Sequence, residues 1–356
     1  MKKKVISAVV SAAVLCTAMP VSAGADSEKL RIMPVGDSIT DGYWEQGGYR
    51  KYLSYALEQK GFSDFDLVGP KGMDKESFDY NGRSVDYDGN YCGYSGYAIQ
   101  NMSGAEARQG ILETLQNGNM IKTYDPDIVL LQIGTNDILS AYNDGITERL
   151  EGLINYILDE GSEGETVFVT TIPDIDAVTV SNWLWAYGEV KWNSSEEEFA
   201  EIVQGYVDSY NASIAELVSK MQADGKNVMY GDIHSVVDMD SDLYDGVHPN
   251  ESGYEKMGLY WADVLENYLT GSTQPVTGTT TTSATETATA TETTAATEPY
   301  IPMNEYEVAD IVGLASFLLG RDQQRITADN YGRFDLNGND ELDVYDLVLM
   351  RRRIFK

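Results

Sequence analysis

Hydrophobic residues in the middle of the chain fall into two alternating patterns. Ile128–Ile133 is an apolar run interrupted only by Gln132, which is typical of a strand buried on both faces. Similar short runs predict strands at Leu30–Val35, Phe65–Val68, Val167–Ile172 and Val228–Tyr230. Apolar positions at helical spacing predict helices over Tyr49–Gln59, 146–158, Glu197–Gln222 and Gly253–Leu269. This alternation predicts a three-layer α/β/α sandwich with a parallel sheet.

The two ends of the chain show different patterns. Lys2–Lys4, the apolar stretch Val5–Met19 and the small residues Val21–Ala23 form the three parts of a secretory signal peptide. Residues 272–298 are rich in Thr and lack apolar periodicity, which predicts a linker. We therefore expect a secreted, extracellular protein with a signal peptide (1–25), an α/β domain (26–271), a linker (272–298) and a small C-terminal domain (299–356).

Composition limits the chemistry. Lys and Arg total 25 and Asp and Glu total 57, so the net charge is −32, which argues against nucleic acid or an anionic membrane as partner. The chain has two histidines, His234 and His248, so a multi-histidine zinc centre is close to excluded. Loss of the signal peptide leaves Cys92 as the only cysteine, which predicts a domain without an internal disulfide. Cys92 is itself a conceivable nucleophile.

Three short motifs lie where predicted strands end, and in parallel sheets chemistry gathers at that edge. Ser38 lies in GDSIT after the first strand and is either a nucleophile or a helix cap. Asn136 lies in GTND and either donates to an oxyanion or forms a turn. Asp245 and His248 lie in DGVHPN, where the carboxylate can orient the imidazole toward Ser38. A lone histidine can also be structural, but the shared sheet edge favours catalysis.

These motifs, together with a glycine in Tyr94–Tyr97, occur in the order found in the SGNH, or GDSL, hydrolases, which the domain resembles. The resemblance implies Ser38 as nucleophile, His248 as base and Asp245 as the residue that orients it. It also implies an oxyanion hole made of the backbone N–H groups of Ser38 and Gly96 and the side chain of Asn136. Gly93 is the alternative for the glycine.

Further motifs resemble family 3 carbohydrate esterases, the acetyl xylan esterase group. They are Gly47–Arg50, Asp66–Gly69, Gly93–Gly96 and His248–Asn250. That family usually has histidines around the glycine block and a Trp after it. Tyr94 and Tyr97 stand at those positions here, so the acyl and sugar pockets need not match those of the family. The resemblance implies a Ser-His-Asp esterase that deacetylates xylan without a catalytic cofactor. A lipid- or thioester-directed GDSL esterase and a non-catalytic carbohydrate-binding module are the alternatives.

Aromatic and basic residues are candidates for substrate contact. The segment 174–195 carries Trp183, Trp185 and Trp192, which form either a wall for sugar rings or the small core of a long loop. Arg50 and Arg83 could bind sugar hydroxyls, although surface pairing with acidic residues is the expected role.

The C-terminal segment 335–346 has the spacing of an EF-hand calcium loop. It resembles a dockerin, a small all-α domain that attaches cellulosomal enzymes to the cohesin domains of a scaffoldin. An equivalent first loop would place Pro299, Ile301 and Met303 at ligand positions, so we expect one calcium ion. The expected ligands are Asp335, Asn337, Asn339, Glu341, Asp343 and Asp346. The resemblance places Val344, Tyr345, Arg351 and Arg352 against cohesin.

Overall fold

A computed structural model describes residues 29–103 and 107–272, together with the single positions Leu314, Ile326, Phe334 and Leu342. The chain divides into two compact units, 1–282 and 283–356, and every element below belongs to the first. The expected signal peptide, the linker after its first residue, the calcium ligands and the cohesin-facing residues lie outside the described residues.

Six parallel strands form the central sheet. The order is β2-β1-β6-β7-β8, with β5 also pairing with β1. Every residue of β6 and β7 is buried, as the apolar runs predicted. The parallel α/β prediction is therefore confirmed for this unit. The strands are β1 (Leu30–Gly36), β2 (Phe65–Leu67), β5 (Cys92–Gly93), β6 (Ile128–Gln132), β7 (Thr166–Thr170) and β8 (Val228–Gly231).

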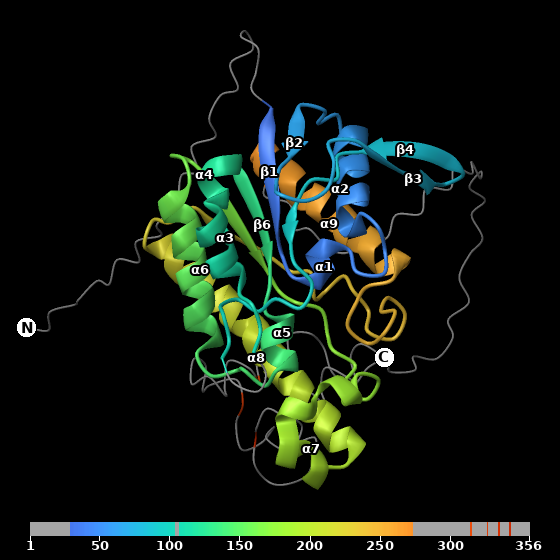
Figure 1. The fold of residues 1–356 in the computed structure, drawn as a ribbon, viewed down its shortest axis with the longest axis vertical. Coiled ribbons are helices and arrows are strands. Elements are labelled where there is room, and N and C mark those ends of the chain that lie inside the picture. The colour runs from blue at the N-terminus through green and yellow to red at the C-terminus, as the bar shows by residue number, and fades with distance from the viewer. Residues whose placement is uncertain are drawn as a thin grey trace, which may run out of the picture. The chain divides into compact units, whose positions relative to one another are not determined.

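Helices cover both faces of this sheet (Figure 1). On one face α2 (Gly48–Gln59) packs along α9 (Glu251–Thr270), and on the other α6 (Ile146–Glu160) packs on α8 (Glu196–Ala223). Successive residues of a strand pack into opposite cores. Leu130 lies in the core on the α2–α9 side, and Leu131 lies in the core on the α6–α8 side. The α6–α8 core also receives α3 (Ile111–Gly118) and α4 (Met120–Tyr124).

The sequence patterns did not predict several short elements. An antiparallel hairpin, β3 (Glu76–Tyr80) and β4 (Arg83–Tyr87), turns at Asn81 and Gly82, which both have positive φ. The remaining elements are α1 (Ser38–Asp41), α5 (Thr135–Leu139), two turns of 3₁₀-helix (Ser181–Trp183 and Trp185–Tyr187) and α7 (Gly188–Asn193). Within the described residues, no helix combines the length and the hydropathy that a membrane span requires.

Candidate active site

Ser38 is the first residue of α1, directly beyond the carboxyl end of β1. Asp37 caps this helix, because its carboxylate accepts a hydrogen bond of 3.0 Å from the Ile39 N–H. A side chain at Gly36 would lie 2.1 Å from the Gln132 carbonyl oxygen, so only glycine fits between β1 and β6. Burial raises the pKa of Asp37 to about 7. The sharp strand-to-helix turn leaves Ser38 with 5% of its surface exposed at the sheet edge.

His248 and Asp245 complete a hydrogen-bonded chain with Ser38. His248 Nε2 lies 2.8 Å from Ser38 Oγ, and His248 Nδ1 lies 2.8 Å from Asp245 Oδ2. The backbone N–H of His248 donates to Asp245 Oδ1 at 2.9 Å. Burial alone would raise the pKa of Asp245, but these donors outweigh it and lower the pKa below its usual value. The arrangement thus holds a charged carboxylate behind an imidazole that faces a serine hydroxyl.

Asn136 is held beside this chain by Arg108. Arg108 Nη1 donates to Asn136 Oδ1 at 2.9 Å and to the Gly96 carbonyl oxygen at 3.1 Å. Asn136 Nδ2 donates to the Tyr97 carbonyl oxygen at 2.9 Å. Because the guanidinium fixes which end of the amide is the acceptor, it directs the NH₂ group away from itself. Arg108 lies in no recognisable motif, so its contribution could not be predicted from the sequence.

The two candidate glycines occupy different places. Gly93 lies in β5, where a side chain would meet the Asp41 backbone nitrogen at 2.7 Å, so close packing on α1 explains its identity. Gly96 has φ of 82° and shares Arg108 with Asn136. The structure therefore favours Gly96 over Gly93 as the glycine beside Asn136.

Asp41 ties the glycine segment to α1. Its carboxylate accepts hydrogen bonds from Tyr91 Oη at 2.7 Å and Ser95 Oγ at 2.6 Å, and it pairs with Lys71. Burial opposes ionisation, but these partners lower the pKa of Asp41. An ionised Asp41 thereby fixes the 91–96 segment against α1.

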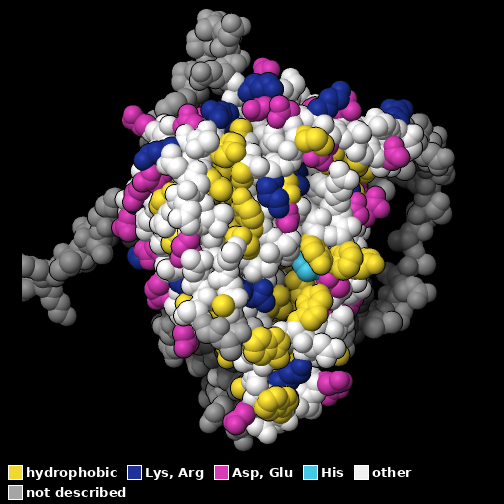
Figure 2. All heavy atoms as spheres, viewed as in Figure 1, with side chains coloured by type: hydrophobic (Ala, Val, Ile, Leu, Met, Phe, Trp, Pro, Cys, Tyr) yellow, Lys and Arg dark blue, Asp and Glu magenta, His cyan; other side chains and the backbone are white. Residues whose placement is uncertain are grey.

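Aromatic side chains surround His248. The Tyr43 ring lies 4.5 Å from the imidazole centroid, and Trp183 lies 6.3 Å from it on a different loop. Trp44 Nε1 donates to Asp245 Oδ2 at 2.8 Å. Figure 2 shows a histidine bordered by hydrophobic side chains on this face. Tyr43 and Trp44 follow the GDSIT motif closely, and that proximity was the only sequence signal for them.

The aromatic segment 174–195 contains both buried and exposed rings. Tyr187 is buried and packs edge-to-face on Phe199, so it belongs to the core. Trp183, Trp185 and Trp192 are exposed, and Trp183 is the one in ring contact with His248.

The structure excludes one conceivable nucleophile and corrects one expectation. Cys92 is fully buried, and burial raises its pKa to about 12, so it stays a neutral thiol and cannot act as the nucleophile. Surface pairing was wrong for Arg50, which is buried. Its guanidinium donates to the Thr40 carbonyl oxygen and lies 3.7 Å over the Tyr91 ring. Arg83 lies exposed on β4.

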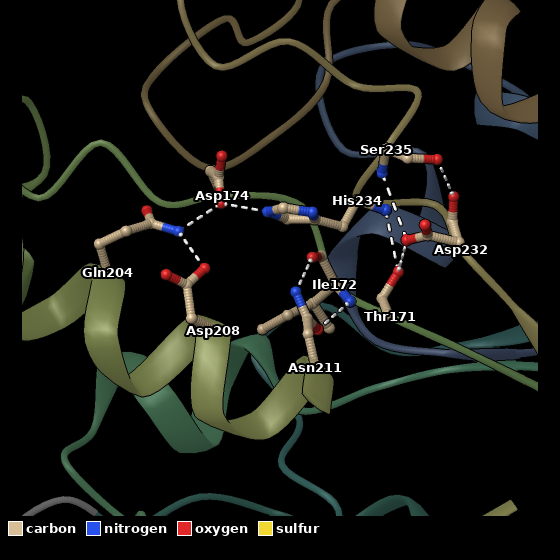
Figure 3. Close-up of polar contacts among 9 residues, drawn as sticks. All are labelled: Thr171, Ile172, Asp174, Gln204, Asp208, Asn211, Asp232, His234 and Ser235. Atoms are coloured by element: carbon tan, nitrogen blue, oxygen red, sulfur yellow. Dashed lines mark hydrogen bonds and ion pairs between the residues drawn. The ribbon is translucent and has the colours of Figure 1, made fainter. Parts of the chain in front are cut away.

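The second histidine belongs to a separate cluster (Figure 3). His234 Nε2 lies 2.7 Å from Asp174 Oδ1, and Gln204 Nε2 donates to both Asp174 and Asp208. Among the residues that the structure describes, Asp174, Asp208 and His234 are the group whose ligand atoms, within 4.8 Å of one another, could hold a metal ion. The Gln204 amide already bridges the two carboxylates, which accounts for their approach without an ion.

Residues 32–261 match the GDSL-like lipase/acylhydrolase family over most of the chain. The protein belongs to this family. A multidomain esterase of Ruminococcus flavefaciens is 49% identical over 250 residues, which span 69% of this chain and 30% of that protein. A putative endoglucanase X of Acetivibrio thermocellus is 29% identical over 163 residues, covering 44% of this chain and 59% of the relative. The GDSL-like chain therefore spans less than two thirds of both relatives.

Solved structures of carbohydrate esterases are also similar. The Clostridium thermocellum family 3 carbohydrate esterase is 25% identical with a TM-score of 0.46, and covers 68% of this chain and 98% of its own. A family 3 carbohydrate esterase from Talaromyces cellulolyticus is 18% identical with a TM-score of 0.49. The match covers 68% of this chain and 99% of that esterase.

Proposed function

We propose that this GDSL-like protein is a serine carboxylic ester hydrolase that removes acetyl groups from xylan or related hemicellulose. The observation that carries the proposal is the continuous chain from Asp245 through His248 to Ser38, with both links at 2.8 Å. This hydrogen-bonded series of three residues favours a hydrolase over a non-catalytic carbohydrate-binding module. The esterase name of the Ruminococcus relative supports the reaction class.

The geometry supports an acyl-enzyme mechanism. Ser38 Oγ attacks the ester carbonyl carbon while His248 Nε2 takes the hydroxyl proton. Negative charge develops on the carbonyl oxygen, where the N–H groups of Ser38 and Gly96 and the Asn136 amide donate. The bond to the sugar oxygen then breaks, and His248 returns the proton to that oxygen. Water repeats the sequence and releases acetate, while Asp245 stays ionised behind the imidazolium.

Two features support an acetylated sugar as substrate. The small exposed fraction of Ser38 favours a short acyl group, because a long chain needs a wider opening. Exposed aromatic rings beside His248 offer flat surfaces that pack against sugar rings. The family 3 carbohydrate esterase motifs at Gly47–Arg50 and His248–Asn250 point to the same class.

We extend the proposal to secretion and attachment. The N-terminal 25 residues have the pattern of a signal peptide, and segment 335–346 has the spacing of one calcium-binding dockerin loop. The proposed partners are thus acetylated plant cell-wall polysaccharide and a scaffoldin cohesin, which would place the enzyme outside the cell in a cellulosome. Cohesin binding by the full chain, measured with and without EDTA, checks this part: binding that survives chelation contradicts it.

Substrate profiling tests the enzymatic proposal. We expect acetate release from acetylated xylan and hydrolysis of p-nitrophenyl acetate, with rates falling steeply for longer p-nitrophenyl esters. Ser38→Ala should abolish both activities. A preference for long acyl chains or thioesters would instead support a lipid- or thioester-directed GDSL esterase.

A further inference from the structure

Trp44 is hydrogen-bonded to the Asp245 carboxylate and also largely exposed to solvent. Its indole N–H donates to Asp245 Oδ2 at 2.8 Å, the same oxygen that faces His248 Nδ1. Yet 59% of the residue is exposed to solvent. One side chain thus joins the carboxylate of the catalytic chain to the open surface.

The backbone holds Trp44 in an unfavourable conformation. Its φ of 67° lies in the left-handed region, which bulky residues rarely adopt. The loop is pinned next to the nucleophile, because the Tyr43 N–H donates to the Ser38 carbonyl oxygen at 3.0 Å. Strain that the surroundings maintain is frequent at functional sites. Here it aims the indole N–H at Asp245 while the ring faces outward.

A second exposed ring extends this surface. The Tyr244 ring lies 5.3 Å from that of Trp44 at an interplanar angle of 35°, and Tyr244 is 66% exposed. The Tyr244 N–H donates to the His248 carbonyl oxygen at 2.8 Å, so this ring belongs to the catalytic loop. Contiguous apolar surface left in water is typical of interaction sites and ligand-binding grooves.

We propose that Trp44 and Tyr244 form a sugar-binding shelf, and that Trp44 is also a positioning residue for Asp245. The shelf rests on the proposed function, whereas the positioning role needs only an ester substrate. A sugar ring packed on the indole restrains it, and the indole N–H in turn restrains the carboxylate that orients His248. Binding of the polysaccharide and alignment of the catalytic chain are therefore linked through one side chain.

Two variants separate the two roles. Trp44→Phe keeps an aromatic face but removes the N–H, so kcat should fall about tenfold on both p-nitrophenyl acetate and acetylated xylan, with little change in KM for the small ester. Tyr244→Ala removes a ring but no donor to Asp245. It should raise KM for acetylated xylan severalfold and lower kcat on p-nitrophenyl acetate less than Trp44→Phe does. Tyr230→Ala removes an exposed aromatic residue of β8 outside these contacts and is the matched control.

Wild-type kcat in Trp44→Phe on both substrates would overturn the positioning role. Binding of unacetylated xylohexaose to the Ser38→Ala protein, measured by calorimetry, tests the shelf separately. Affinity should fall in the Ser38→Ala/Tyr244→Ala double variant, and unchanged affinity would overturn the shelf.

If wild-type protein hydrolyses p-nitrophenyl acetate but not acetylated xylan, the proposed substrate fails, and the Trp44→Phe result on the small ester still decides positioning. If Trp44→Phe does not fold, as judged by circular dichroism, Tyr244→Ala and the calorimetry still decide the shelf.

Discussion

The two histidines of this domain look alike at close range but differ in what lies beyond them. Each contacts an aspartate, His248 at 2.8 Å from Asp245 and His234 at 2.7 Å from Asp174. The other ring nitrogen of His248 faces the Ser38 hydroxyl, whereas the partner of His234 is an aspartate shared with Gln204. An Asp–His pair is therefore no sign of catalysis by itself. The group at the second ring nitrogen decides the role.

Replacing each histidine with alanine should give the largest difference in activity between the two regions. His248→Ala should lower kcat on p-nitrophenyl acetate by about 10⁶, because Ser38 loses its base. His234→Ala should keep kcat close to wild type, since its ring pairs with Asp174 rather than with Ser38. Steady-state kinetics on both purified variants checks this. Equal losses in the two variants would contradict the assignment of His248.

The aspartate behind His248 should matter nearly as much. Asp245→Asn keeps the size of the side chain but removes the charge that stabilises the imidazolium, so kcat should fall by about 10⁴. Asp174→Asn is the matched change behind His234. If both variants lose activity to the same extent, Asp245 has no special role.

Asn136, the proposed oxyanion donor, lies in the Ser38–His248 region and has no counterpart in the proposal for the His234 cluster. Asn136→Ala should lower kcat by about 10²–10³ with a small effect on KM, because the amide acts mainly on the charged intermediate. Arg108→Lys loses the planar guanidinium whose Nη1 joins Asn136 to Gly96, and it should show a smaller loss in the same parameter. An effect confined to KM would show that Asn136 binds substrate rather than the oxyanion.

The buried carboxyl under Ser38 predicts a pH effect on stability. Burial raises the Asp37 pKa from 3.8 to about 7, so between these values the folded state binds more protons than the unfolded state. Stability relative to Asp37→Asn should therefore fall as pH rises from 4 to 7, by up to about 1.4 kcal/mol per pH unit. Urea unfolding of both proteins across this range measures the difference. Parallel stability profiles would contradict the raised pKa.

The smallest expected effect is on the stability of the His234 cluster. His234→Ala removes a partly exposed hydrogen bond to Asp174 and should lower the free energy of unfolding by about 1 kcal/mol. Thermal unfolding with and without added divalent cations measures it. A cation-dependent rise in Tm that needs His234 would show that this cluster holds a metal after all.

The sequence predicted the part of this domain that depends on local pattern. The apolar run at Ile128–Ile133, interrupted only by Gln132, predicted β6. Ser38 and His248 both border predicted sheet-edge loops, and this predicted their convergence. The hairpin at Asn81 and Gly82 carried a turn signal, Asn-Gly between alternating residues, that the strand prediction did not use.

Other residues could not be predicted because their roles depend on loops that meet only in the fold. Arg108 reaches Asn136 from a segment without periodicity, and Trp44 reaches Asp245 across most of the domain sequence. Arg50 looked like a surface charge, yet the fold buries it beneath Tyr91. Such contacts form only when distant segments pack together, so the composition and spacing of a short segment do not predict them.

Labelling of the nucleophile tests the central claim most directly. Wild-type protein would be treated with a fluorophosphonate, mapped by peptide mass spectrometry and assayed for acetate release from acetylated xylan. We predict one adduct, on Ser38, with activity falling in proportion to labelling, and no adduct in Ser38→Ala. Acetate release that persists in fully labelled protein, or in Ser38→Ala, would contradict the account.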